Sequence, residues 1–445
     1  MCSSDLTLVG ILVGILILSL IMVLHESGHY FVGKALGFKI EEFSIFMGPV
    51  LFEREKNGIK YNIKAIPIGA SVRFAGEEES EEEGVAPKYE SDDPGLFFNR
   101  PKWRRAVVVF MGPFINFLTA LLAFLLLFNL TGAVIPQISA VEDNTVVAES
   151  GEIGVGDEIV SINGYRVRSG LDASMAQLTG DPAAGWEITY IDAESGTRRE
   201  TKLSPQTIEQ TAIGINYLDD NGKFIIQYVA PDSNNGNPVL LPGDEILAIE
   251  GIPFSDHDRI GNVISSSVGT PLIIEVIRDG ERVRLESAPS IITSAMPLGL
   301  YLTQTHKFSD TVQQSLAYPW SIIRSNIAGI GMIFSGQLEL RDSLAGPIGI
   351  VSIVSETVQQ STTFRQVIEY VLMLFGLISV AVGFFNLLPI PPLDGGHLLF
   401  TAIEGIRRKP LSEGFKRVVT SIGLVIFLAL FVLVIYLDAS RLLGF

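Results

Sequence analysis

Two histidines and a glutamate stand at a spacing that suits a metal ion. The segment reads His25-Glu26-Ser27-Gly28-His29. On a helix, residues four apart share a face, so both imidazoles can reach one ion while Glu26 lies one step around. A catalytic zinc site adds one further protein ligand and a water to such a pair. The metal lowers the pKa of that water to about 7, and a glutamate takes its proton as it attacks a carbonyl.

A chance match is the alternative for this segment. The chain holds only 5 histidines among 445 residues. Chance occurrence of the pattern is therefore below about one in a hundred such sequences. The segment also interrupts a long apolar run, where ionisable side chains are costly and are functional by default. These residues predict a metal-dependent hydrolase.

Four apolar runs predict four transmembrane helices, at 6–33, 106–130, 366–388 and 418–437. The first contains 19 uncharged residues, Leu6–Leu24. At 1.5 Å per residue they extend ~28 Å, close to the hydrocarbon thickness of a bilayer. A cleaved signal peptide is the alternative for this run. It fits poorly, because the run has no basic segment before it and no small-residue cleavage site after it.

The overall composition agrees with a membrane protein. Hydrophobic residues make up 47% of the chain and charged residues 18%, and the mean hydropathy is +0.38. This composition therefore argues against a purely soluble protein. The net charge of −17 argues against a nucleic-acid partner. The single cysteine excludes an internal disulfide and a zinc site made of cysteines.

Basic residues near the ends of the apolar runs predict the orientation in the membrane. They gather in the loops 35–105 and 403–417, whereas both ends of the chain are poor in them. This pattern predicts cytosolic loops, extracytoplasmic termini and an extracytoplasmic 131–310 stretch. The metal site would then lie near the cytosolic face.

A third metal ligand is expected from the segment that follows the third run, Asn386-Leu-Leu-Pro-Ile-Pro-Pro-Leu-Asp-Gly-Gly-His397. Its three prolines cannot continue a helix. Irregular backbone at membrane depth must be buried in protein or line a wet cavity. We expect Asp394 on a fixed, non-helical turn near His25 and His29. A helix-terminating surface loop is the alternative, and His397 competes as the ligand.

A β-hairpin is predicted between the first two spans. Residues 43–54 and 59–69 form its strands around Asn57-Gly58, a strong hairpin dipeptide. An exposed edge strand could pair with the backbone of an unwound substrate helix. The predicted pairing residues are Ile59, Tyr61, Ile63 and Ala65. A purely structural hairpin on the inner membrane surface is the alternative.

Residues 131–290 have ordinary globular composition and contain an internal repeat. The sequence Gly-Asp-Glu-Ile at 156–159 recurs at 243–246, about 87 residues later. Both copies are similar to PDZ domains, which predicts two such domains at 132–210 and 211–290. A ligand-binding role and a steric gate are both compatible with the sequence. Neither copy shows an obvious intact carboxylate-binding loop, which favours the gate.

Two other segments have simpler interpretations. Within 291–340, the stretch 311–336 is apolar but interrupted by Arg324 and Asn326, which predicts a helix lying on the membrane surface. Residues 341–445 complete the membrane core. Six of the seven residues Glu77–Glu83 are glutamates, typical of a solvated loop.

These motifs together resemble the site-2 protease family of intramembrane metalloproteases, and in particular its bacterial RseP branch. Further matching motifs are spread along the chain: Phe43-Ser-Ile45, Ile66-Pro-Ile-Gly69, Met111-Gly-Pro113 with Asn116, and Ala345-Gly-Pro-Ile-Gly349. The resemblance implies a Zn²⁺ ion held by His25, His29 and Asp394. It also implies Glu26 as general base and Asn386 as a substrate or oxyanion contact.

The sequence departs from the family pattern at two places in the hairpin. Phe46 and Met47 stand where the family has a glycine-rich turn, and Ala70 stands where it has the second of two glycines. Both positions bear on the substrate groove. Asn116 has two readings of equal weight, an interhelical hydrogen bond and a role at the site.

The predicted fold is a multi-pass α-helical membrane protein with four transmembrane helices, a cytosolic or re-entrant β-hairpin and two extracytoplasmic PDZ-like domains. The resemblance implies a zinc endopeptidase of a bacterial inner membrane, acting in regulated intramembrane proteolysis. Its expected partners are the lipid bilayer and single-pass membrane proteins already cut once, of the anti-sigma-factor type, and also remnant signal peptides. The PDZ pair would exclude substrates that keep a bulky outer domain.

Two other functions compete with the protease. One is a catalytically inactive membrane scaffold that binds partners through its PDZ pair. The other is a zinc-binding transporter, which fits the proline-rich break but not the tandem outer domains. The intact set His25, Glu26, His29 and Asp394 speaks against the scaffold.

Overall fold

The structure is a computed structural model that describes residues 3–76, 92–220, 222–230, 233–278, 280–338, 344–361 and 363–443. The predicted loop Glu77–Glu83 lies outside these residues. The chain divides into two compact units. Unit 1 comprises Met1–Pro136, Tyr165–Thr179 and Leu302–Phe445, and unit 2 comprises Gln137–Gly164 and Gly180–Tyr301.

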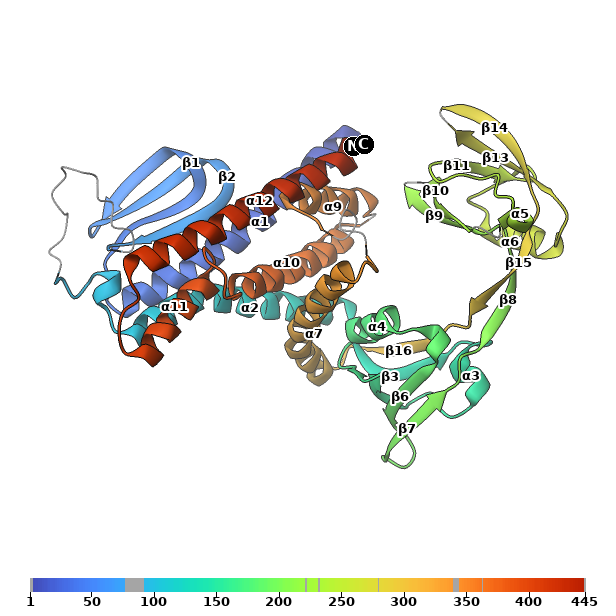
Figure 1. The fold of residues 1–445 in the computed structure, drawn as a ribbon, viewed down its shortest axis with the longest axis horizontal. Helices are drawn as coiled ribbons and strands as arrows, with labels where there is room; N and C mark the ends of the chain where they lie inside the picture. The colour runs from blue at the N-terminus through green and yellow to red at the C-terminus, as the bar shows by residue number, and fades with distance from the viewer. Residues whose placement is uncertain are drawn as a thin grey trace. The chain divides into compact units, whose positions relative to one another are not determined.

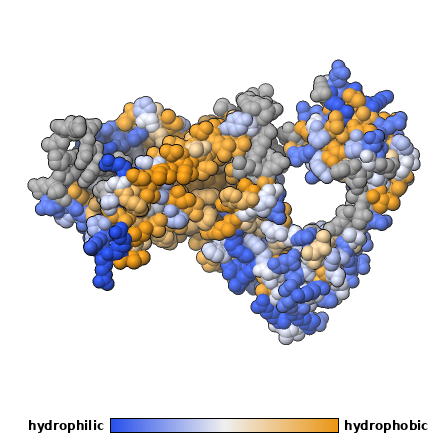
Figure 2. All heavy atoms as spheres, viewed as in Figure 1, coloured by the Kyte–Doolittle hydropathy of each residue, from blue (hydrophilic) through white to orange (hydrophobic). Residues whose placement is uncertain are grey.

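Long apolar helices dominate unit 1 (Figure 1). They are α1 (Ser3–Ala35), α2 (Lys102–Thr131), α10 (Phe364–Asn386) and α12 (Glu413–Leu443). Each contains a stretch long and apolar enough to cross a membrane: Val9–Ala35, Lys102–Thr131, Phe364–Asn386 and Gly414–Ser440. Figure 2 shows hydrophobic residues gathered over the surface of this helical part. The four predicted apolar runs are thus found as helices.

Helix α2 contacts most of the other helices of unit 1. It packs on α1, on α10, on α7 (Phe308–Phe334) and on α11 (Asp394–Arg407). Phe124 of α2 is fully buried with Val380 of α10 and Ile322 of α7. Helix α9 (Pro347–Gln360) packs on α1 instead. Helix α7 confirms the helix expected within 311–336, and it is not among the four candidate spans.

The predicted hairpin is present as β1 (Ile40–Lys56) and β2 (Ile59–Phe74). Asn57 and Gly58 connect the strands with positive φ angles of 55° and 75°, as a two-residue hairpin turn requires. Phe46 also has a positive φ, 71°, at the place where the family has a glycine-rich turn.

The two strands fold back on each other into a wider sheet than a simple hairpin. Residues 42–45 have partners in both 60–63 and 70–73, and residues 60–63 also pair with 52–55. Tyr61 and Ile63 therefore lie inside the sheet, which differs from the prediction of an exposed edge there. Among the described residues, the segment 70–73 has strand partners on one side, at 42–45. The reason is the length of both strands, which lets each bend and pair twice.

Unit 2 is rich in β-strands. The sequence repeat appears as a repeated order of elements, which lie in unit 2 except for Tyr165–Thr179 of the first copy, which belongs to unit 1. The first copy runs β4 (Glu158–Ile162), β5 (Tyr165–Arg166), α4 (Gly170–Thr179), β6 (Trp186–Ile191) and β7 (Arg198–Leu203). The second runs β11 (Glu245–Ile249), β12 (Ile252–Pro253), α6 (His257–Ser266), β13 (Leu272–Arg278) and β14 (Glu281–Ser287). The repeated aspartate has the same role in both copies. Asp157 accepts a hydrogen bond from the Gly154 N–H, and Asp244 accepts one from the Leu241 N–H, each at 2.9 Å.

The remaining strands extend the two sheets. One sheet has the order β16-β3-β4-β6-β7, with β3 at Ala133–Val141 and β16 at Leu300–Thr305. The other has the order β14-β13-β11-β10-β9, with β9 at Ile215–Asp220 and β10 at Lys223–Val229. Strands β8 (Thr207–Ala212) and β15 (Ser290–Ala295) form a separate pair. Because β16 comes after the second copy in sequence, the sheet of the first copy is not completed within 132–210.

Candidate active site

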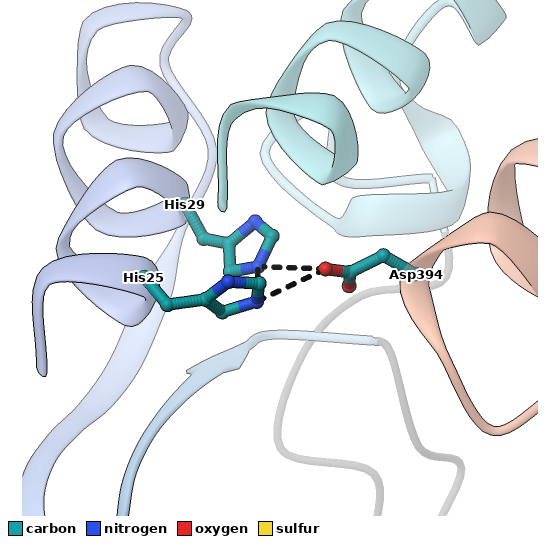
Figure 3. A group of neighbouring side chains, drawn as sticks. All are labelled: His25, His29 and Asp394. Carbon is teal, nitrogen blue, oxygen red and sulfur yellow. Dashed lines mark hydrogen bonds and ion pairs between the residues drawn. The ribbon is translucent and has the colours of Figure 1, made fainter. Parts of the chain in front are cut away.

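Three side chains converge in unit 1, as Figure 3 shows. The Nε2 atoms of His25 and His29 lie 3.0 Å and 3.5 Å from Oδ2 of Asp394. The two Nε2 atoms are 3.2 Å apart. All three possible ligand atoms lie within 4.8 Å of one another. The residues predicted from two distant segments are therefore brought to one point.

Two helices present these groups. Helix α1 continues without a break through His25 and His29, so the four-residue spacing puts both rings on one face. Helix α10 ends at Asn386, and α11 begins at Asp394 after the proline-rich connection. Asp394 is thus the first residue of a helix, which corrects the expectation of a non-helical turn. A carboxylate is favourable there, because the first helical turn carries partial positive charge.

The surroundings fit a metal ion. Oδ2 of Asp394 is buried and has no hydrogen-bond donor among the described residues, while its neighbours are the two imidazole nitrogens. A buried carboxylate oxygen without a partner is costly, and a cation would satisfy it. A Cβ on Gly112 would clash with His29 Nε2 and lie 2.8 Å from His25 Nε2, so this glycine keeps the space clear. Two imidazoles and one carboxylate are a donor set typical of catalytic zinc.

The ring nitrogens that face away from this point contact α2. Nδ1 of His29 lies 2.9 Å from the carbonyl oxygen of Val108. Since a carbonyl only accepts, Nδ1 carries the proton and Nε2 keeps its lone pair for the metal. Nδ1 of His25 lies 3.1 Å from the side-chain amide of Asn116.

Glu26 is held beside the three ligands but is not one of them. Its Oε2 accepts a hydrogen bond from the Val72 N–H at 3.0 Å. In sequence it directly follows His25 on α1, one step around the helix from the face that carries both imidazoles. Strand β2 therefore fixes the carboxylate that the sequence predicts as general base.

The other predicted site residues make hydrogen bonds to residues outside the group His25, His29 and Asp394. Asn386 ends α10, and its amide donates to the Val382 carbonyl at 2.9 Å. Its side-chain oxygen has no hydrogen-bond partner among the described residues. Tyr61 contacts α1 through its hydroxyl, which lies 2.7 Å from the Tyr30 hydroxyl.

Two contributors were not predicted from the sequence. Gly112 belongs to the family motif Met111-Gly-Pro113, but its role is to leave space beside the imidazoles of α1. Val72 contributes only a backbone N–H, which no residue type reveals. Both depend on long-range packing, so no local pattern could have identified them.

Comparison with known proteins agrees with this geometry. The model of peptidase family M50 matches residues 13–430. The regulator of sigma-E protease RseP of Escherichia coli K12 is 28% identical over 456 residues, which cover 96% of this chain and 98% of that protein. A protein of Agrobacterium fabrum named as a zinc metalloprotease is 28% identical over 440 residues, covering 97% and 95% of the two chains.

Among solved structures, the HtrA3 PDZ domain is 21% identical over 20% of this chain and 93% of that domain, with a TM-score of 0.17. That similarity is too small to support a conclusion. The family match covers most of the chain, and it includes His25, His29 and Asp394. The chain therefore belongs to peptidase family M50, the site-2 proteases, and is a zinc metalloprotease.

Proposed function

We propose that this protease cuts the transmembrane segment of single-span membrane proteins. The observation that carries the proposal is the convergence of His25, His29 and Asp394 among helices apolar enough to cross a bilayer. A metal site in that position reaches peptide bonds that soluble proteases cannot. The inner membrane is the location that the apolar helices and the similarity to RseP support.

The chain's own residues supply positioning and proton transfer. His25, His29 and Asp394 would hold the zinc ion, which when bound lowers the pKa of a water and polarises the scissile carbonyl. Glu26, oriented by the Val72 N–H, takes a proton from the attacking water and returns it to the leaving nitrogen. The free side-chain oxygen or the amide of Asn386 contacts the substrate beside this point.

A substrate helix must unwind before it can be cut, because its carbonyls are engaged in its own hydrogen bonds. The segment 70–73 has a pairing partner on one side, and its Val72 N–H already points at Glu26. An extended substrate could add to this edge and regain backbone hydrogen bonds next to the base. We assign the pairing role to 70–73 in place of the predicted Ile59, Tyr61, Ile63 and Ala65.

The biological setting extends the same proposal. The termini and the two repeat copies, which we take to be PDZ-like, would be extracytoplasmic, with the site near the cytosolic face. The copies would act as a gate against substrates that retain a bulky outer domain. Substrates of the anti-sigma-factor type, and remnant signal peptides, fit this scheme. The relative named as a regulator of sigma-E protease supports it.

The test is Glu26→Gln in the full-length protein, with a tagged single-span reporter and measured zinc content. We expect the variant to keep its zinc and to lose cleavage by about 100-fold or more, the usual scale of general base catalysis. Glu53→Gln changes an exposed glutamate of the sheet that contacts Glu26, so it serves as control and should cut normally. Release of the reporter fragment by Glu26→Gln contradicts the mechanism. A wild type that binds zinc and partners but never cuts favours the scaffold.

A further inference from the structure

Asn116 of α2 is fully buried and directed at a metal ligand. Its side-chain amide nitrogen lies 3.1 Å from Nδ1 of His25, and its side-chain oxygen has no hydrogen-bond partner among the described residues. A buried polar atom without a partner is costly, so this arrangement calls for an explanation.

The protonation of His25 provides one. If Nε2 of His25 binds the metal, Nδ1 carries the ring proton. In that case the amide nitrogen of Asn116 and Nδ1–H of His25 are both donors, and they cannot form a hydrogen bond with each other. The two ends of an asparagine amide have nearly the same shape, and their assignment follows from the hydrogen bonds they make. Rotating the amide by about 180° places Oδ1 as the acceptor for Nδ1–H, and the amino group moves to the space that Oδ1 held.

We propose that Asn116 is a positioning residue whose side-chain oxygen accepts the Nδ1–H of His25 and so presents Nε2 to the metal. The inference rests on the proposed zinc site and deepens it. Asn116 does not touch the metal or the substrate; it acts through His25.

The second histidine shows the same arrangement. His29 contacts an oxygen acceptor from the same helix, the Val108 carbonyl, at 2.9 Å. With Asn116 in the proposed orientation, α2 would provide one acceptor for each imidazole. One helix would then set the ring orientation and the proton position of both ligands from α1.

The backbone around Asn116 is fixed by neighbouring contacts. Its carbonyl accepts hydrogen bonds from Ser379 Oγ at 3.0 Å and from Thr119 Oγ at 3.1 Å. A Cβ built on Gly383 of α10 would lie 3.3 Å from the Asn116 Cβ, so α10 approaches closely here. The side chain therefore has little freedom to move away from His25. This rigidity is what a positioning role requires.

The test compares two variants of the purified full-length protein, Asn116→Leu and Asn116→Asp. Leucine has a similar size but no acceptor, whereas a carboxylate can accept but cannot donate. Zinc affinity is measured by competition with a chelator, which needs no substrate. We expect affinity to fall about 10–100-fold for Asn116→Leu, the usual effect of removing a partner behind a ligand. We expect Asn116→Asp to bind zinc at least about as tightly as the wild type.

Asn129→Leu is the matched control, because Asn129 is an exposed amide on the same helix whose bond goes to the Leu125 carbonyl. Thermal unfolding of each zinc-free variant separates loss of affinity from loss of fold. Unchanged zinc affinity in a folded Asn116→Leu overturns the proposal and leaves a packing role. Equal weakening in Asn116→Asp overturns it too, because the amide would then be the donor. Failure of the function proposed above is seen separately, as a wild type that binds zinc but does not cleave.

Discussion

Gly112 shows how much the site depends on a missing side chain. It lies on α2 directly against both Nε2 atoms, where a single added methyl group would occupy the space between the imidazoles. The ligands supply the donor atoms, but the glycine leaves room for an ion among them. Metal binding is therefore expected to be sensitive to a residue that makes no bond to the metal.

Gly112→Ala is expected to lower the zinc content of the purified protein by about tenfold or more, a loss on the scale seen when a ligand is misplaced. The added Cβ would lie 2.8 Å from His25 Nε2 and closer still to His29 Nε2, so the rings must move. Zinc is measured by metal analysis after dialysis. Gly405→Ala is the control, since a Cβ there, on the helix that carries Asp394, meets nothing within 4 Å. Full zinc occupancy in Gly112→Ala contradicts this account.

The convergence of His25 and His29 could be predicted from the sequence because helix geometry fixes their spacing locally. The prediction of Asp394 also required the proline-rich break and the family resemblance. The roles of the residues that contact the histidines from α2 were more difficult to predict. Asn116 was noticed only as a polar residue in an apolar span, and Gly112 only as part of a motif. Their roles depend on how α1 and α2 pack, which no window of sequence contains.

At the scale of elements, the hairpin was predicted correctly but its pairing was not. Asn57-Gly58 specifies the turn because both residues tolerate positive φ. The alternation of 59–63 then suggested an exposed edge. The second set of pairs, between 42–45 and 70–73, joins segments far apart along the strands and changes which edge is free. A local pattern cannot show that change.

Ala70→Pro tests the new edge. Since the Val72 N–H points away from β1, the alternation of antiparallel pairs directs the Ala70 N–H outward too. Proline removes that donor without removing a bond to β1. Losing one hydrogen bond of about 1.4 kcal/mol corresponds to about tenfold slower cleavage of the reporter.

The control for Ala70→Pro lies on the opposite edge of the same sheet. Glu55 pairs with Lys60 next to the hairpin turn, so its N–H also points outward. Glu55→Pro should accumulate and cleave like the wild type. Equal loss in both variants would indicate general disruption of the sheet, and normal cleavage by Ala70→Pro would remove the pairing role from this edge.

At the scale of the whole chain, hydropathy and the internal repeat predicted most of the organisation. The four apolar runs are helices in the structure. The two Gly-Asp-Glu-Ile segments form equivalent turns, in which Asp157 and Asp244 accept backbone hydrogen bonds. The prediction missed that β16 completes the first sheet from beyond residue 290. Strands β3 and β16 are far apart in the sequence, so their pairing depends on the tertiary fold. The residues of β16 alone do not indicate which strand it pairs with.

Within unit 1, one buried carboxylate joins the consecutive helices α11 and α12 to α2, which lies far from them in the sequence. Glu404 of α11 contacts Arg105 of α2 at 3.0 Å and Lys416 of α12 at 3.0 Å, and it accepts a hydrogen bond from the Leu411 N–H at 3.2 Å. Burial alone raises the pKa of Glu404, but these three partners outweigh it and hold the pKa below the usual range. The charged form is therefore the one that stabilises the fold.

The sign of the pH dependence follows from that lowered pKa. The stabilisation by Glu404 is complete above the unfolded pKa of about 4.3 and is lost as the pH falls through the lower folded pKa. Glu404→Gln removes the buried negative charge that Arg105 and Lys416 contact, which costs about 3–5 kcal/mol near neutral pH. In thermal unfolding of the detergent-solubilised protein, the variant should therefore melt well below the wild type at pH 7, and the gap should narrow near pH 3. Glu369→Gln, which removes a more exposed pair with Arg365, should change the melting temperature little. If the difference in melting temperature between Glu404→Gln and the wild type does not depend on pH, then packing of the side chain, and not its charge, stabilises the contact between these helices.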